Sequence, residues 1–357
     1  MKISAGRKRL ALDFSRRRPH VPRGFSGSVS PAMKDYRDPA AQRRLDFALM
    51  WRAEGDSRAA LEAVRAALEL EPAWPEALYM EGDLLAEAGE SAAAVAAWCR
   101  CLAADPGDVM GATIRLAQLR AIPAPESLPE AYVRTLFDQY AGRFEESLVG
   151  RLEYRSPQAM RALYDRLGGG PVARVLDLGC GTGLSGEAFR GVAGWLAGVD
   201  LSPGMLAQAR AKGVYDDLAE AEALAFLRAP GPLFDLIVAV DMVVYLGDLE
   251  PLLRACAARL APGGLLLLSA QRTELADYLL GADSRFAHSP AYLERAAAAC
   301  GLSLEAAERS AYRLEGGAPL PGQMMALSRS GGVCDAAAAP GLAVPDRRDD
   351  PPESVQA

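Results

Sequence analysis

One segment limits the fold of this chain more than any other: an apolar run that leads directly into three alternating glycines. The run covers residues 175–178 and is interrupted only by Asp177, and Gly179, Gly181 and Gly183 follow it. Glycine is required where the backbone turns sharply or where a ligand approaches more closely than a Cβ atom would allow. In open parallel sheets, ligands bind in the crevice at the carboxyl end of the strands. The segment therefore predicts a parallel α/β sheet with a ligand site at the end of its first strand.

The same glycines fit two kinds of ligand. Gly181, Gly183 and Gly186 also have the G-x-G-x-x-G spacing of dinucleotide-binding proteins, which alone is weak evidence. Asp177 decides between the two, because a carboxylate beside this turn would repel a pyrophosphate. The same carboxylate would attract the ammonium group of a methionine-derived methyl donor. The residues thus favour a methyl donor, and a nicotinamide dinucleotide is the alternative.

A second carboxylate follows at the end of the next predicted strand. Asp200 lies 21 residues after Gly179, beside the same crevice, and can accept hydrogen bonds from both hydroxyl groups of a ribose. The alternative is that Asp200 caps the following helix, although Ser202 before Pro203 offers a cap of its own.

Short apolar runs alternate with helical patterns from residue 172 onward, which is typical of βαβ units. The runs predict strands at residues 174–178, 195–199, 236–240, 265–269, 303–314 and 324–328. A helix is expected to begin after the cap signal Ser289-Pro290.

Together these segments resemble the motifs of the class I S-adenosylmethionine-dependent methyltransferases. Residues 177–183 and 200–206 are similar to the first two motifs, residues 215–222 to the acidic third, residues 234–238 with Asp241 to the fourth, and residues 260–264 to the turn before the fifth strand. The resemblance implies a doubly wound α/β domain over residues 131–330, with strand order 3-2-1-4-5-7-6 and S-adenosyl-L-methionine as cofactor. It carries cofactor contacts over to Asp177, Gly179, Cys180, Gly181, Gly183, Asp200, Leu201, Met205, Glu222, Ala223, Asp241 and Tyr140. Glu222, the implied adenine contact, departs from the Asp that is more usual there.

The residues just before the predicted sheet resemble one subgroup of these methyltransferases. Residues 132–144, with Tyr154-Arg155-Ser156-Pro157, resemble the lead-in of predicted bacterial methyltransferases that also carry tetratricopeptide repeats. In that subgroup the lead-in helix covers the donor, which implies that Tyr140 contacts the methionyl end. The alternative is ordinary core packing, because the apolar residues recur at helical spacing. They are Val133, Leu136, Phe137, Tyr140, Phe144 and Leu148.

A sequence repeat precedes this domain, within residues 41–121. A glycine, an alanine and a proline recur 34 positions apart: Gly55, Ala60 and Pro72, then Gly89, Ala94 and Pro106. The period resembles the tetratricopeptide repeat, in which small residues let two antiparallel helices pack closely and the proline ends the second helix. Residues 109–119 look like the opening helix of a third unit, and residues 122–130 like a linker. The module either recruits a protein partner through a peptide-binding groove or serves as a spacer or dimer surface.

Composition limits the partners. The net charge of −7 argues against general binding of polyanions, so nucleic acid is an unlikely partner. Two histidines and six scattered cysteines leave no residues for a multi-histidine or paired-cysteine metal centre, so no metal is expected. The chain has neither a long apolar run nor a signal-like start, which predicts a cytoplasmic protein without membrane contact. Residues 1–40, which are basic and contain an alternative start at Met33, and residues 331–357 are expected to be disordered.

Methyl transfer is an in-line displacement at a sulfonium carbon, so a protein mainly has to align donor and acceptor and exclude water. A base is useful when the acceptor is a hydroxyl or a protonated amine, and Asp241, Tyr245 and His288 are the candidates. Each has an alternative role: Asp241 as a donor-site contact or helix cap, Tyr245 in the core, His288 on the surface. We expect a methyltransferase for a small molecule. The alternatives are a protein methyltransferase whose repeats recruit the substrate, and a repeat-based adaptor whose second domain binds the donor without turnover.

Overall fold

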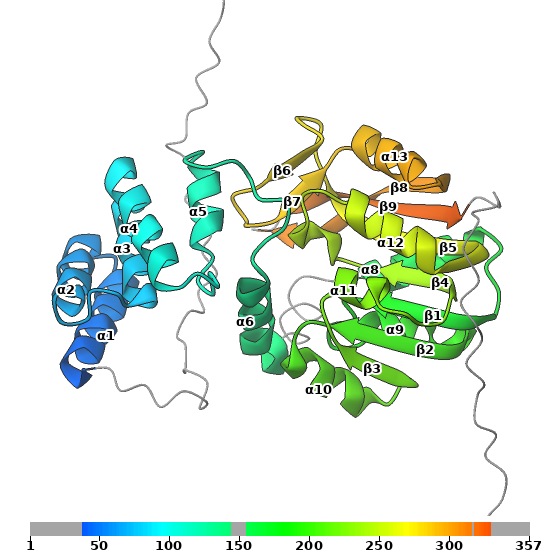
Figure 1. The fold of residues 1–357 in the computed structure, drawn as a ribbon, viewed down its shortest axis with the longest axis horizontal. Coiled ribbons are helices and arrows are strands. Elements are labelled where there is room, and N and C mark those ends of the chain that lie inside the picture. Colours follow the sequence, from blue (N-terminus) through cyan, green and yellow to red (C-terminus); the bar gives the residue numbers. More distant parts are fainter. Residues whose placement is uncertain (1–37, 144–154, 316–317, 330–357) are drawn as a thin grey trace, which may run out of the picture.

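The computed structural model describes residues 38–143, 155–315 and 318–329. A helical module lies to one side of a mixed sheet that carries helices on both faces (Figure 1). No helix of the described residues is long and apolar enough to span a bilayer. The predictions for the two ends of the chain, and for Phe144, Leu148 and Tyr154, lie outside these residues.

The helical module consists of two helical hairpins and a further short helix. Its elements are α1 (Pro39–Glu54), α2 (Ser57–Leu70), α3 (Pro75–Glu87), α4 (Ser91–Ala104) and α5 (Ala112–Gln118). Gly55 (φ 86°) and Gly89 (φ 83°) adopt the left-handed conformation after the first helix of each hairpin, which glycine does at little cost. A Cβ atom on Gly82 would lie 2.3 Å from Nε1 of Trp98, so close packing of α3 on α4 requires glycine there. The predicted hairpins are confirmed, and α5 is shorter than the predicted segment.

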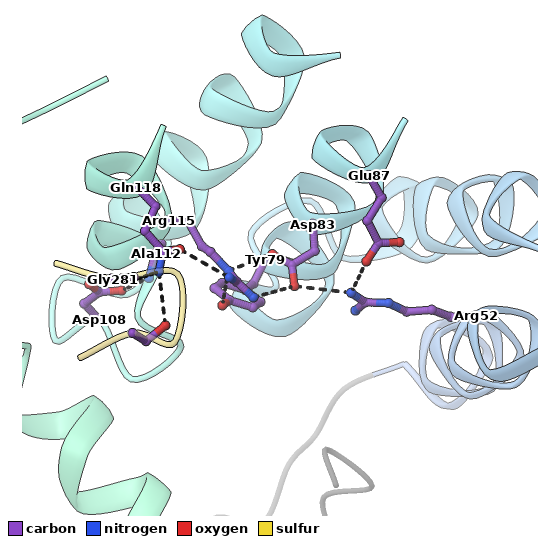
Figure 2. Close-up of polar contacts among 10 residues, drawn as sticks. Arg52, Tyr79, Asp83, Glu87, Asp108, Ala112, Arg115, Gln118 and Gly281 are labelled. Carbon is purple, nitrogen blue, oxygen red and sulfur yellow. Dashed lines mark hydrogen bonds and ion pairs between the residues drawn. The ribbon is translucent and has the colours of Figure 1, made fainter. Parts of the chain in front are cut away.

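A buried carboxylate joins three of these helices (Figure 2). Asp83 of α3 is 6% exposed and forms ion pairs with Arg52 of α1 at 3.4 Å and with Arg115 of α5 at 3.1 Å. Arg115 also donates a hydrogen bond to the hydroxyl of Tyr79 at 2.9 Å. Burial raises the pKa of Asp83 and the two guanidinium groups lower it. The first, third and fifth helices are therefore held together by polar as well as apolar contacts.

The sheet has the predicted doubly wound topology. Its strands are β1 (Val172–Leu178), β2 (Ala193–Asp200), β3 (Asp217–Glu220), β4 (Phe234–Ala239), β5 (Leu260–Arg272), β8 (Leu302–Glu315) and β9 (Ala318–Arg329). Strands β3-β2-β1-β4-β5 are parallel neighbours, β9 runs antiparallel to β5, and β8 pairs with β9. This is the expected order 3-2-1-4-5-7-6 when β8 and β9 are counted as the sixth and seventh strands.

Two short strands extend the sheet beyond the prediction. β6 (Tyr278–Leu280) and β7 (Phe286–His288) form an antiparallel hairpin, and β7 pairs in parallel with the end of β5 through Gln271 and Arg272. We call this unit the β6–β7 hairpin. With it, the sheet has nine strands among the described residues. The hairpin continues the sheet beside the carboxyl end of β5.

Alternate residues of the central strands face two separate cores. On one face, Val175 of β1 packs in a cluster with residues of α8 (Ser156–Arg166) and α9 (Leu184–Phe189). On the other face, Leu176 packs in a cluster with residues of α11 (Ala223–Arg228), α12 (Glu250–Arg259) and α13 (Pro290–Ala299). The side chain of Ser289 caps α13 as predicted, accepting a hydrogen bond from the N–H of Tyr292. The sheet is thus covered on both sides, and its strand ends remain for ligands.

The connection between α5 and α6 (Glu130–Tyr140) lies against the sheet domain. Leu128 donates its N–H to the backbone oxygen of Tyr245 at 2.9 Å, and Gly247 donates to the oxygen of Glu126 at 2.7 Å. Ile114 of α5 packs with Leu128 and with residues of the β6–β7 hairpin. The helical module therefore contacts the loop that follows β4 and the hairpin beside it (Figure 1).

Candidate active site

Asp177 lies at the carboxyl end of β1, next to the glycine loop. Its side chain is 2% exposed, and its Oδ2 accepts a hydrogen bond from the hydroxyl of Tyr215 at 2.6 Å. Its Oδ1 is buried and has no hydrogen-bond partner among the described residues. Burial raises the pKa of Asp177 to about 7; Tyr215 and the backbone of Gly186 lower it, and the charge of Asp200 raises it. An orphaned buried oxygen of this kind is suited to a ligand that donates hydrogen bonds.

The glycine loop fits a ligand at its middle residue. Gly179, Gly181 and Gly183 have φ values of 65°, 54° and 95°, all in the left-handed region that favours glycine. A Cβ atom on Gly181 would meet nothing within 4 Å, so the loop faces open space there. A Cβ atom on Gly179 would lie 2.7 Å from Cγ of Met242, which packs the loop after β4 against the glycine loop. Cys180 between them is buried, and its N–H donates to the oxygen of Val199 on β2.

The third glycine of the dinucleotide-like spacing makes room for an aromatic ring. A Cβ atom on Gly186 would lie 2.4 Å from the hydroxyl oxygen of Tyr215, and one on Gly198 would lie 2.9 Å from its ring. Tyr215 therefore runs between α9 and β2 to reach Asp177. The sequence placed Tyr215 in a motif without giving it a role. The signal that could have found it is the pair of glycines on two neighbouring elements.

Asp200 lies at the end of β2, on the other side of the glycine loop. Its Oδ2 accepts the N–H of Gly181 and its Oδ1 accepts the N–H of Ser202, both at 2.8 Å. The hydroxyl of Ser202, not Asp200, caps α10 (Pro203–Lys212) by accepting the N–H of Met205. Burial raises the pKa of Asp200. The two acids thus flank one loop. Because Ser202 caps α10, Asp200 is not needed as the helix cap and is available to a ligand.

Two further residues of the second motif, Leu201 and Met205, differ in their burial. Leu201 is half-buried beside Asp200. The side chain of Met205 is completely buried, so it supports α10 from the interior.

Helix α6 is attached to the N-terminus of α10. Oδ1 of Asp138 accepts hydrogen bonds from the hydroxyl of Ser202 at 2.5 Å and from the N–H of Gly204 at 3.1 Å. These bonds place the end of α6, with the half-buried Tyr140, close to the residues that follow Asp200. The arrangement is compatible with a helix that covers the donor.

Glu222 has a structural role that the sequence did not predict. It caps α11, and its two carboxylate oxygens accept the N–H groups of Leu224 at 2.9 Å and Ala225 at 2.7 Å. Ala223 is the first residue of that helix. A carboxylate has further lone pairs, so an adenine amino group remains a compatible donor.

Asp241 lies in the loop after β4, one residue before the Met242 that packs on Gly179. Its φ of 59° is unusual for a residue with a side chain. Its N–H donates to the hydroxyl oxygen of Ser269 at 2.9 Å, and its Oδ1 accepts the hydroxyl of Ser269 at 2.7 Å. Ser269 of β5 thus holds Asp241 just after the end of β4 in a strained conformation.

The other two candidate bases lie in packed surroundings. Tyr245, in the 3₁₀ turn Val243–Tyr245, packs edge-on against Phe137 of α6, with ring centroids 5.4 Å apart. His288 is 0% exposed, and its Nε2 lies 2.9 Å from the oxygen of Leu246 and 3.1 Å from that of Gly247. Burial lowers the pKa of His288 to about 4, although the carbonyl groups raise it. The alternative role given to His288, a residue on the surface, is wrong, because the unpredicted β6–β7 hairpin carries it into the interior.

The fold and the site define a class of protein: a doubly wound α/β domain with a glycine loop after its first strand and a carboxylate at the end of each of its first two strands. Residues 152–307 match a protein family described as a methyltransferase domain. This chain therefore carries a class I S-adenosylmethionine-dependent methyltransferase domain, and S-adenosylmethionine is the cofactor of that class. No group of three His, Cys, Asp or Glu suited to a metal ion occurs in the described parts of the chain.

Comparison with individual proteins finds partial similarity to other methyltransferases. The ubiquinone biosynthesis O-methyltransferase of Xanthomonas campestris pv. campestris (strain B100) is 35% identical over 103 residues, which are 28% of this chain and 43% of that protein. The protein of the same name from Xylella fastidiosa (strain 9a5c) is 35% identical over 112 residues, 30% of this chain and 46% of that protein. The chain thus spans less than half the length of these curated relatives. Among solved structures, magnesium protoporphyrin IX methyltransferase from Synechocystis PCC 6803 with bound SAH has a TM-score of 0.45 and 18% identity, over 56% of this chain and 99% of that chain.

Proposed function

We propose that this chain transfers the methyl group of S-adenosylmethionine to a small-molecule acceptor. The observation that supports it most is the buried Oδ1 of Asp177, which lacks a partner among the described residues and lies beside the glycine loop. A cationic ammonium group satisfies that oxygen, whereas a pyrophosphate would be repelled by it. The domain class points to the same ligand.

The proposal assigns the predicted cofactor residues to parts of the donor. Asp177 binds the ammonium group, Asp200 the ribose hydroxyls, and the backbone at Gly181 allows the close approach. Glu222 and Ala223 border the adenine, while Tyr140 at the end of α6 covers the methionyl end. These assignments follow the ends of β1, β2 and β3, which lie side by side in the sheet.

The cofactor supplies an electrophilic methyl group on a sulfonium centre. The protein has to hold the acceptor in line with that group and exclude water. We assign the role of base to Asp241 among the three candidates, because Ser269 holds it beside the glycine loop, next to Met242, while His288 is buried against backbone carbonyls. Tyr245, which packs edge-on against Phe137, borders the acceptor in this proposal.

A small molecule is the first choice of acceptor because the part of the domain that lies beyond β5 is compact. The β6–β7 hairpin has two strands of three residues each, and its inward face is occupied by Phe286 and His288. The relatives reported above are named for O-methylation in ubiquinone biosynthesis, which is compatible with an oxygen acceptor on a small molecule.

A protein acceptor recruited by the helical module is the second candidate. It is favoured by the contacts of residues 126–128 with Tyr245 and Gly247. These contacts bring the helical module next to the loop after β4, where we place the acceptor. The contacts of Ile114 with the hairpin add to them. A protein acceptor would need both the module and the donor site.

Calorimetric titration of the full chain tests the donor site. We expect S-adenosylhomocysteine, the demethylated product, to bind and NADH not to bind. Asp177→Ala should weaken the binding by at least about 30-fold, because it removes the partner of a buried charge. The matched control is Asp165→Ala, which removes a half-exposed carboxylate of α8. Binding of NADH without S-adenosylhomocysteine would overturn the proposal, and transfer of a labelled methyl group to candidate acceptors separates an enzyme from an adaptor.

A further inference from the structure

Tyr215 belongs to the connection between α10 and β3 in the chain, and its side chain reaches the buried carboxyl end of β1. Its hydroxyl donates to Oδ2 of Asp177 at 2.6 Å. The opposite oxygen of the same carboxylate, Oδ1, is buried without a partner among the residues that the structure describes. The two oxygens of one acid are thus in different states: one is held by the protein and the other is left for a donor.

We propose that Tyr215 is a positioning residue of the donor site, whose hydroxyl holds one oxygen of Asp177 so that the other is presented to the ammonium group of the cofactor. The inference rests on the function proposed above. It adds a residue outside the glycine loop and outside the two strand-end acids. It also explains why a polar aromatic residue, and not only an apolar one, fills this space.

The packing around the ring keeps the hydroxyl in place. A Cβ atom on Gly186 would lie 2.4 Å from the hydroxyl oxygen, and one on Gly198 would lie 2.9 Å from Cε1 of the ring. A Cβ atom on Gly183 would lie 3.1 Å from Cε2. Three glycines on two elements therefore form a slot for this ring. A phenylalanine would fit the same slot but could not donate the hydrogen bond.

The electrostatics of the site show what the hydrogen bond achieves. Burial disfavours the charged form of Asp177 and raises its pKa, and the charge of Asp200 acts in the same direction. Burial also raises the pKa of the Cys180 thiol and of the Tyr215 phenol, so both neighbours are neutral near pH 7. The Tyr215 hydroxyl and the backbone of Gly186 favour the anion that a cationic ligand needs.

The test compares Tyr215→Phe with Tyr164→Phe by calorimetric titration of S-adenosylhomocysteine from pH 6.5 to 8.5. Tyr164 is a matched control, because it is a buried tyrosine whose hydroxyl donates to the oxygen of Gly170 at 2.7 Å. At pH 7 we expect Tyr215→Phe to bind about tenfold more weakly than the wild type, since a hydrogen bond to a charged group is lost. At pH 8.5 the difference should shrink, because Asp177 is then ionised in both proteins. Tyr164→Phe should follow the wild type throughout.

A second variant covers the case in which Tyr215→Phe does not fold. Gly186→Ala keeps the phenol but pushes the ring away from Asp177, and it should show the same loss at pH 7. The inference is overturned if Tyr215→Phe binds like Tyr164→Phe, or if its loss is equal at every pH, which is the result of general damage. If the wild type itself does not bind S-adenosylhomocysteine, the proposed function fails together with the inference.

Discussion

Gln118, the last residue of α5, donates a hydrogen bond from Nε2 to the backbone oxygen of Gly281 at 2.9 Å, across 163 positions of the chain (Figure 2). The same nitrogen lies 3.3 Å from the hydroxyl oxygen of Ser284. Both partners belong to the turn of the β6–β7 hairpin. Helix α5, whose Arg115 pairs with Asp83, is therefore attached to the sheet domain, close to the loop that carries Tyr245.

Replacing Ile114 by alanine should loosen this attachment. Ile114 is 2% exposed and packs with Leu128 and Phe286 between the two parts of the molecule. Its truncation should cost about 2–5 kcal/mol, because it leaves a cavity at that junction. Scanning calorimetry should show a separate, earlier transition for the helical module. Leu119→Ala, at an exposed position beside the same helix, is the control and should leave the trace unchanged. Identical traces for the two variants would contradict the role of Ile114.

Gly82→Ala should destabilise the helical module without affecting the donor site. The added methyl group would lie 2.3 Å from Nε1 of Trp98, whose ring is 2% exposed and has little room to move. Overpacking of this kind typically costs about 1–3 kcal/mol. Urea unfolding measures the loss, and binding of S-adenosylhomocysteine should persist. Gly191→Ala is the control, since a Cβ atom there meets nothing within 4 Å. Equal stability of both variants would show that α3 and α4 can separate at no cost.

The ion pairs of Asp83 should contribute far more than those on the surface. Asp83→Asn leaves Arg52 and Arg115 without their buried partner, and should cost about 3 kcal/mol. Glu62→Gln breaks an i,i+4 pair with Arg58 in which the side chains are 68% and 90% exposed, and should cost less than about 0.5 kcal/mol. Chemical unfolding of the two variants gives both values. A cost for Asp83→Asn as small as that of Glu62→Gln would refute the structural role of the network.

Local patterns were enough to predict the centre of the sheet but not its edges. The strands β1, β2 and β4 are apolar runs buried on both faces, and the predicted cores of these strands are confirmed. β5 and β9 are longer than predicted. Each is extended by pairing at both ends, β5 with β4 and β9, and β9 with β5 and β8. β3 (Asp217–Glu220) is a short, partly exposed edge strand without apolar alternation, so nothing in its own residues indicates it.

The candidate site shows the same division. Asp177 and Asp200 could be placed at the ends of their strands because that position is encoded in adjacent residues. The proposed role of Tyr215 depends on Gly186 and Gly198, which only the fold brings together around its ring. The burial of His288 depends on a hairpin of two three-residue strands, which is too short to leave a periodic pattern.

Binding of the cofactor product at neutral pH should release protons. Burial raises the pKa of Asp177 to about 7, so part of these side chains is protonated at pH 7 before the ligand binds. A cationic ammonium group favours the anion, and a fraction of a proton per site should leave on binding. Titrations of S-adenosylhomocysteine at pH 7 in phosphate and in Tris, which differ in ionisation enthalpy, measure this number. Asp177→Asn removes the titrating group, and proton release that survives this change would have to come from another residue.

His288 should make the fold sensitive to mild acid. Burial lowers its pKa to about 4, below the ordinary value near 6.5, so the unfolded chain binds a proton in this range more readily than the folded one. The stabilisation is therefore complete above pH 6.5 and is lost as the pH falls through 4, by on the order of 3 kcal/mol in total. Urea unfolding of the wild type and of His288→Gln between pH 7 and pH 4.5 isolates this contribution, because the carboxylates titrate equally in both proteins. The free energy of unfolding should fall more steeply with acid in the wild type, and parallel curves would mean that the pKa of His288 is the same in the folded and the unfolded chain.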